Sequence, residues 1–157
     1  LSVSWKGVAD AYHAVADLPV EIWMVTSDIA PPDDWRVSKW FKSVDQATMA
    51  EIYNSCDVLV KLSRMESYCL PAMEAMACGC AVVIGAVDGE IEYLRPGENC
   101  ILVDRGSRTQ AKEAVELLKA DRELLDRLVA GGLETAAGYS LHRTRDALAD
   151  LMEEWLA

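Results

Sequence analysis

The chain is short of basic residues, and this shortage already narrows its function. Its 157 residues hold 15 Lys and Arg against 26 Asp and Glu, which gives a formal net charge of −11. A nucleic-acid partner would need a clustered positive surface to meet its phosphates, so we expect none. No run of 18 apolar residues and no signal peptide is present. We therefore expect a cytoplasmic chain without a transmembrane segment.

Spacings that bind metals are lacking as well. The chain has five cysteines and two histidines, and no two cysteines form a C-x2-C pair. We therefore expect no metal site. Four cysteines are predicted to be buried small apolar side chains in a reducing compartment: Cys56, Cys78, Cys80 and Cys100. Cys69 stands where a helix should begin, which could lower the pKa of its thiol, but a structural role is favoured for it too.

Strand and helix patterns alternate along most of the chain. Helical spacing marks residues 6–18, 45–56 and 71–78. Short apolar strand patterns mark residues 20–25, 36–40, 57–62, 81–84 and 100–103. This alternation predicts an α/β fold with a Rossmann-like, doubly wound parallel sheet and ligands at the carboxyl ends of its strands. The length suits one domain with one core.

Helical patterns continue behind the last strand. Ser107 and Gln110 predict a capping box at the start of one helix, and a second helix is predicted from Asp121 to a stop at Gly131-Gly132. Ser140 can cap a last helix. That helix carries an apolar stripe of Leu148, Leu151, Met152 and Trp155. Such a stripe favours packing against the domain core.

One run, ESYCLPAMEAMACG from Glu66 to Gly79, differs from a generic α/β sequence. Glu66 should lie on a loop after a strand, and Glu74 about one turn inside a helix that Pro71 helps to start. A helix start offers unpaired N–H groups to phosphate, whereas carboxylates accept hydrogen bonds from hydroxyls. This combination favours a ligand that joins phosphate to polyhydroxylated groups, such as a nucleotide sugar.

The same run resembles the E-x7-E signature of the family 4, or group 1, retaining glycosyltransferases of the GT-B fold. The matching residues are Ser63, Glu66, Leu70, Pro71, Glu74, Ala75, Met76, Ala77, Gly79, Val82 and Val83. A family Gly-Gly-x-x-Glu turn resembles Asp88, Gly89 and Glu92, and a family Lys-Gly at the first helix resembles Lys6-Gly7. Glu92 is expected to orient that turn or cap its helix rather than to act in catalysis.

The chain departs from the family pattern in three places. Ser67, Tyr68 and Cys69 replace a Gly-Phe-Gly and add two Cβ atoms near the expected phosphate. Asp88 replaces a Gly, although Asp tolerates left-handed backbone less well. An Arg that precedes the Lys-Gly in the family has no counterpart, because the chain starts at Leu1.

The resemblance implies two Rossmann-like domains with the active site between them. We therefore expect residues 1–157 to be the donor-binding domain of a longer enzyme, with an N-terminal acceptor domain as its partner. A peripheral contact of that missing half with the inner membrane remains open. An intact and a truncated first strand both remain open. The resemblance also implies that the last helix crosses to the partner domain, so its apolar stripe could instead be interdomain surface. No cofactor is expected, because the nucleotide diphosphate sugar is a substrate.

Positions that match the family suggest a role for each site residue. Glu74 would accept hydrogen bonds from the ribose hydroxyls, and Glu66 from the hydroxyls of the donor sugar. Lys6, and with less weight Arg64, would balance the diphosphate charge. The plainer interpretations are a helix-start acid for Glu74, a solvated loop acid for Glu66 and a surface lysine for Lys6.

The remaining donor-binding positions lie in or beside the same loop. Ser63 and Tyr68 complete the expected donor-binding set. Backbone N–H groups for the phosphate are expected from Cys69, Leu70 and Ala72, whereas Pro71 has no N–H to donate.

The implied reaction moves a hexose to a sugar, glycolipid or polysaccharide acceptor with retention of anomeric configuration. A front-face mechanism needs no protein nucleophile, whereas a double displacement needs a carboxylate, for which Glu66 is the only local candidate. We favour the front-face route, because hydroxyl binding already accounts for Glu66. Two other functions remain open. One is a sugar-nucleotide isomerase of the same fold, which the E-x7-E run argues against, and the other is an inactive nucleotide-sugar-binding or assembly domain.

Overall fold

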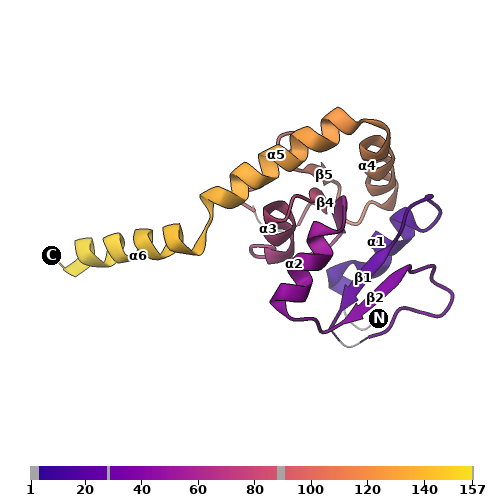
Figure 1. The fold of residues 1–157 in the computed structure, drawn as a ribbon, viewed down its shortest axis with the longest axis horizontal. Coiled ribbons are helices and arrows are strands. Elements are labelled where there is room, and N and C mark those ends of the chain that lie inside the picture. The colour runs from indigo at the N-terminus through magenta and orange to yellow at the C-terminus, as the bar shows by residue number, and fades with distance from the viewer. Residues whose placement is uncertain (1–3, 28, 88–90, 157) are drawn as a thin grey trace.

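The computed structural model describes residues 4–27, 29–87 and 91–156, and it places helices on both sides of short parallel strands (Figure 1). In chain order the elements are η1 (Ser4–Lys6), α1 (Val8–Val15), β1 (Trp23–Thr26), β2 (Lys39–Lys42), α2 (Gln46–Asn54), β3 (Val58–Lys61), α3 (Leu70–Ala77), β4 (Ala81–Gly85), β5 (Ile101–Val103), α4 (Arg108–Ala120), α5 (Arg122–Gly138) and α6 (Leu141–Leu156). Leu1 and the predicted turn at Asp88 and Gly89 lie outside the described residues.

The strands pair in parallel, as the alternating pattern predicted. β3, β4 and β5 form a three-stranded sheet with β4 in the centre, where Val60 lies opposite Val83 and Ile84 opposite Leu102. β1 and β2 form a second parallel pair. The expected Rossmann-like α/β fold is confirmed, with the strands of the described residues distributed over these two sheets.

The core lies on both faces of β4, whose five residues are all buried. Alternate side chains point to opposite faces of a strand. Ala81 and Val83 join a cluster with residues of α1, α4 and α5, whereas Val82 and Ile84 join a second cluster with residues of α3. Two covered faces explain why the strand is continuously apolar instead of alternating.

The first helix is shorter than the predicted 6–18 and starts differently. Lys6 ends the short turn η1, and Gly7 takes a left-handed conformation with φ +64° before α1 begins at Val8. A Cβ on Gly7 would lie 1.8 Å from the carbonyl oxygen of Leu62. Glycine is therefore required here both by the backbone angle and by the close approach of the chain that follows β3.

The capping prediction for α4 is half confirmed. Ser107 caps the helix, because its Oγ accepts a hydrogen bond from the Gln110 N–H at 3.3 Å. The Gln110 side chain does not return to Ser107, since its Oε1 accepts from the Asp104 N–H at 2.6 Å and its Nε2 donates to the Asp104 carboxylate. The local loop therefore competes successfully for the group that would close a capping box.

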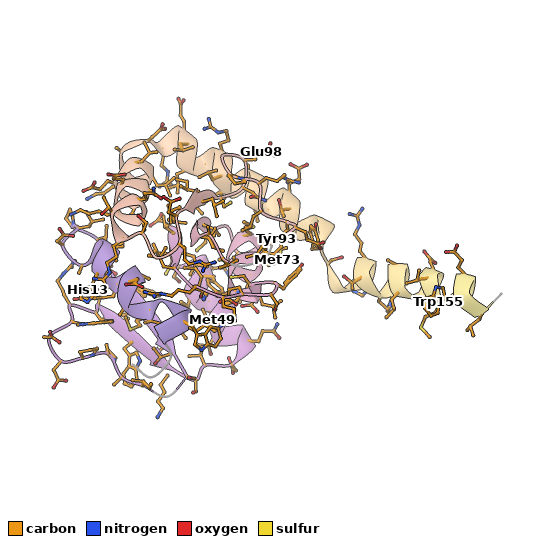
Figure 2. All side chains as sticks on the ribbon, turned by 180° about the vertical axis from the view of Figure 1, so that it is seen from behind. His13, Met49, Met73, Tyr93, Glu98 and Trp155 are labelled. Carbon is orange, nitrogen blue, oxygen red and sulfur yellow. The ribbon has the colours of Figure 1, made fainter. Side chains whose placement is uncertain are left out.

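The predicted stop at Gly131-Gly132 is wrong, because α5 continues through both residues to Gly138. A Cβ on Gly131 would lie 2.2 Å from the carbonyl oxygen of Glu98, and one on Gly132 would lie 3.1 Å from Met76 Cγ. Glu98 lies beside this helix in Figure 2. Both glycines serve close packing of α5 against its neighbours, not helix termination.

The last helix, α6, projects from the body of the molecule (Figure 1). Ser140 precedes it as predicted, and the Arg143 N–H donates to Ser140 Oγ at 3.4 Å. The predicted packing of its apolar stripe on the domain core is wrong, because Leu148, Leu151, Met152 and Trp155 are all exposed. Trp155, at 87% exposure, stands near the far end of the helix in Figure 2. Within the described residues, no helix combines the length and apolarity that crossing a membrane requires.

Candidate functional site

The candidate site forms where β3 ends and the chain turns toward α3. Lys61 is the last residue of β3. Ser63, two residues later, is buried, and Glu66 lies on the loop beyond. The turn η1 carries Lys6 to the same place from the start of the chain. A hydrogen bond from the Arg64 N–H to the Trp5 carbonyl oxygen, at 2.7 Å, joins that turn to the loop.

Three charged side chains meet at this point. The Lys61 ammonium lies 2.7 Å from Glu66 Oε1, and the Lys6 ammonium lies 3.1 Å and 3.3 Å from the two carboxylate oxygens. Lys61 Nζ also donates to Ser63 Oγ, which in turn donates to the Lys6 carbonyl oxygen at 3.2 Å. The Glu66 side chain is only 9% exposed. Its interpretation as a solvated loop acid is therefore wrong.

The surroundings of Glu66 keep it ionised. Burial raises the pKa of its carboxyl group, but the hydrogen bonds of Lys61, Ser63 and Lys6 and the charge of Lys61 outweigh burial, so the pKa falls to about 2. An acid with so low a pKa stays charged at neutral pH and cannot donate a proton. It can accept hydrogen bonds from hydroxyl groups.

The start of α3 differs from the predicted phosphate cradle. Cys69 precedes the helix in a left-handed conformation with φ 58°, and its carbonyl oxygen accepts hydrogen bonds from the Ala72 N–H at 3.0 Å and the Tyr93 hydroxyl at 2.7 Å. The Ala72 N–H therefore already has a hydrogen-bond acceptor within the protein. This corrects the prediction that it donates a hydrogen bond to the phosphate. Leu70 opens the helix with its side chain exposed.

The Cys69 thiol is a structural group. Its side chain is 3% exposed and belongs to the core cluster around α3. Burial raises the pKa of this thiol, and the helix start does not reverse that effect. The structural interpretation of Cys69 is confirmed. The other four cysteines are free thiols too, and Cys80 and Cys100 are buried as predicted. The predicted burial of Cys56 and Cys78 is wrong, because both are only half-buried.

Glu74 and Tyr68 lie close to this start of α3. Glu74 is the fifth residue of α3 and is half-buried. Among the described residues, no hydrogen bond or ion pair engages its carboxylate, so it keeps its full capacity to accept hydrogen bonds. The half-buried Tyr68 ring packs on Tyr93, with ring centroids 5.1 Å apart. Glu92 is exposed.

Arg64 has a partner that the sequence did not indicate. Its Nη2 lies 3.1 Å from one carboxylate oxygen of Asp10, and Arg108 Nη2 lies 2.7 Å from the other. Asp10 comes from α1 and Arg108 from α4. Arg64 therefore joins the site loop to α1, and Asp10 links this pair to Arg108 of α4. Half of the Arg64 side chain remains exposed.

Sequence reasoning missed Lys61, although one signal pointed to it. A lysine after three apolar residues marks the carboxyl end of a parallel strand, which is where ligands bind in this type of fold. Its partner Glu66 is five positions away on an irregular loop, so no helix or strand periodicity predicts that the two charges meet.

The geometry defines a Rossmann-like domain with a charged site at the carboxyl end of its strands, and the comparisons place it in a family. The family model "Glycosyl transferases group 1" matches residues 36–135. The chain is 39% identical to a D-inositol 3-phosphate glycosyltransferase of Geodermatophilus obscurus over 100 residues. This aligned stretch covers 64% of the chain and 22% of the relative. The chain belongs to the group 1 glycosyltransferase family.

Solved structures share the fold of this chain. The HepE protein of Anabaena, solved in complex with UDP-glucose, superimposes with a TM-score of 0.83 at 19% identity, over 96% of this chain and 46% of that one. The C-terminal domain of the glycosyl transferase group 1 family protein LpcC from Francisella tularensis superimposes with a TM-score of 0.60 at 26% identity, over 68% of this chain and 54% of that one. The chain spans about a quarter of the length of the curated relatives it matches.

Proposed function

We propose that this chain is the donor-binding domain of a retaining glycosyltransferase that moves a hexose from a nucleotide diphosphate sugar to a sugar, glycolipid or polysaccharide acceptor. Family membership supports the class of reaction, and the likeness to HepE supports a nucleotide sugar as donor. The resemblance to the LpcC domain supports a place at the carboxyl end of a two-domain enzyme. The acceptor would then bind to the N-terminal domain.

The observation that carries the proposal is the arrangement of charge around Glu66. Two ammonium groups and one largely buried carboxylate leave a local excess of one positive charge in a chain whose net charge is −11. An anionic diphosphate requires such a local excess. The ionised Glu66 beside it offers acceptors for the hydroxyls of the attached sugar, and Glu74 offers acceptors for the ribose hydroxyls.

The low pKa of Glu66 bears on the mechanism. A carboxylate that two lysines stabilise is a weak nucleophile, because their charges oppose loss of its own charge on attack. We therefore assign Glu66 to sugar binding and favour the front-face route, in which the departing diphosphate helps to deprotonate the acceptor. The protein would contribute positioning of the donor and stabilisation of the leaving diphosphate.

Two substitutions separate the roles of the two glutamates. Glu74→Ala should weaken binding of both a nucleoside diphosphate and its sugar conjugate by about 1–3 kcal/mol, because the ribose is common to both ligands. Glu66→Ala should weaken binding of the sugar conjugate more than that of the diphosphate alone, because its hydroxyl contacts are to the sugar. Isothermal titration calorimetry with UDP, GDP, ADP and dTDP and their glucose or mannose conjugates measures both effects.

Glu98→Ala is the matched control, since Glu98 is an exposed acid whose side chain pairs with Arg95 away from this loop. It should leave every affinity unchanged. Equal losses of bare diphosphate binding in Glu66→Ala and Glu74→Ala would contradict the division of roles. Conversion of a nucleotide sugar without any acceptor would favour an isomerase instead.

A further inference from the structure

The two lysines that contact Glu66 differ in how firmly the protein holds them. Lys61 extends from a strand, is 15% exposed, and approaches both Glu66 Oε1 at 2.7 Å and Ser63 Oγ. Lys6 extends from the short turn η1, is 38% exposed, and contacts the carboxylate at 3.1 and 3.3 Å. Its ammonium also lies 4.2 Å from the centroid of the exposed Trp5 ring, and an exposed cation–π contact holds a charge only weakly. Lys6 is therefore the partner that can leave at less cost.

We propose that Lys61 is a positioning residue that keeps Glu66 charged and oriented, so that Lys6 can exchange its contact with Glu66 for an incoming diphosphate. This inference rests on the proposed function, because it takes a diphosphate as the anion that recruits Lys6. Nothing in the family resemblance points to Lys61, since it is not among the residues that match the family pattern.

The need for a second lysine follows from the burial of Glu66. A carboxylate that loses its counter-ion in a poorly hydrated place is destabilised in its charged form. If Lys6 were the only partner, its move to a phosphate would leave Glu66 uncompensated, and the acid would take up a proton as the donor bound. With Lys61 at 2.7 Å, Glu66 keeps an ion pair throughout and continues to accept hydrogen bonds.

Other titratable groups near Glu66 do not replace Lys61. Cys69 on the loop and Tyr93 from the segment before β5 both interact electrostatically with Glu66. Burial raises the pKa of each, so both remain neutral at neutral pH. Within the described residues, the charged groups that contact the Glu66 carboxylate are Lys6 and Lys61.

The first test needs no ligand. The pKa of Glu66 is followed by NMR of its carboxyl carbon in the wild type, in Lys61→Met and in the matched variant Lys6→Met, with Glu66→Gln used to assign the signal. Lys61→Met should raise the pKa of Glu66 by about 1–3 units, and by more than Lys6→Met does. Lys61→Arg should restore most of the low value. An equal or larger rise in Lys6→Met would overturn the proposal.

The second test adds inorganic pyrophosphate, which avoids any choice of nucleoside or sugar. In the wild type, Glu66 should stay ionised between about pH 4 and 7 with the anion bound. In Lys61→Met, pyrophosphate should raise the pKa of Glu66 further, because Lys6 then leaves its only partner unpaired. Binding that leaves the pKa of Glu66 in Lys61→Met unchanged overturns the exchange of Lys6 without touching the proposed function.

Two further outcomes keep the tests separate. If neither pyrophosphate nor UDP, GDP or ADP binds the wild type, the proposed exchange of Lys6 fails together with the proposed function. The pKa of Glu66 in Lys61→Met and Lys6→Met, measured without ligand, still decides whether Lys61 is its main partner. Because Lys61 is largely buried, the fold of each variant is checked by its amide NMR spectrum. Lys61→Gln, which retains a donor for Ser63, replaces Lys61→Met if that variant does not fold, and it should give the same rise in the pKa of Glu66.

Discussion

Asp10 shows how a single buried carboxylate can hold the surroundings of a site together. It lies on α1 and pairs with Arg64 from the loop after β3 and with Arg108 from α4. Burial raises the pKa of Asp10, but the hydrogen bonds and charges of Arg108 and Arg64 outweigh it and hold the pKa below the ordinary value of 3.8. The carboxylate thus joins three segments that are distant in sequence.

Asp10→Asn should lower the free energy of unfolding at neutral pH by about 1–3 kcal/mol, since it removes two charge-assisted contacts. A depressed pKa means that Asp10 stabilises the fold above its unfolded pKa, and that this contribution is lost as the pH falls below 3.8. The difference between variant and wild type should therefore shrink as the pH falls through that region. Urea unfolding at several pH values measures it.

Asp104→Asn is the matched control for this titration, because Asp104 is exposed and contacts only its own loop and the Gln110 amide among the described partners. The assigned ion pairs would be contradicted if the difference in free energy of unfolding between Asp10→Asn and the wild type stayed constant down to low pH.

Part of the site could be predicted from the sequence. Glu66, Glu74 and Lys6 were found from spacing and from the family resemblance, and the structure brings Lys6 to Glu66. Their roles as donor ligands stay predictions. The roles of Lys61 and Asp10 could not be predicted, because each depends on a contact between segments whose approach is fixed only by the packing of the whole domain.

Element boundaries show where local sequence rules fail. β3, α3 and β4 begin and end within a residue or two of their predicted limits, because apolar runs and Pro71 determine them locally. The end of α5 does not follow the local rule. Paired glycines usually end a helix, but here they allow the backbone of Glu98 and the side chain of Met76 to approach α5. Sequence periodicity contains no information about such an approach.

Gly131→Ala should destabilise the protein by about 1–3 kcal/mol, because its Cβ would meet the backbone oxygen of Glu98 and force α5 to move. Gly138→Ala is the matched control in the same helix, since only the end of the Arg143 side chain, at 4.0 Å, lies near the added carbon. It should change stability by no more than about 0.5 kcal/mol. Thermal unfolding of both variants decides the matter, and equal effects would show that Gly131 is not a packing glycine.

At the scale of the whole molecule, α6 stands apart from the domain that carries the site. The apolar stripe of Leu148, Leu151, Met152 and Trp155 faces solvent, in contrast to Leu128 of α5, which is fully buried. The stripe is therefore free to meet another surface, as the family resemblance implies for a partner domain. Because these apolar residues are exposed, the 52% hydrophobic content of the chain overstates the size of its core.

Deleting residues 141–157 should change the free energy of unfolding by less than about 1 kcal/mol, because the large apolar side chains described between residues 142 and 156 are all exposed. Leu128→Ala, which removes a core side chain, should cost about 2–5 kcal/mol under the same conditions. Denaturant unfolding compares the two. A large loss on deletion of α6 would mean that the helix packs against the domain in solution.

The burial of β4 on both faces has a consequence for the motions of the chain. Its backbone amides are enclosed between two strands and two helical layers, so solvent reaches them only when the whole domain opens. Their hydrogen–deuterium exchange should therefore report the global free energy of unfolding, whereas the amides of α6 should exchange through local fraying. Lys61 and Glu66 lie at the edge of the slowly exchanging layer, on the strand paired with β4 and on the loop behind it. We therefore expect the site charges to be anchored to the most slowly exchanging part of the molecule, and the amides of the projecting helix to exchange faster.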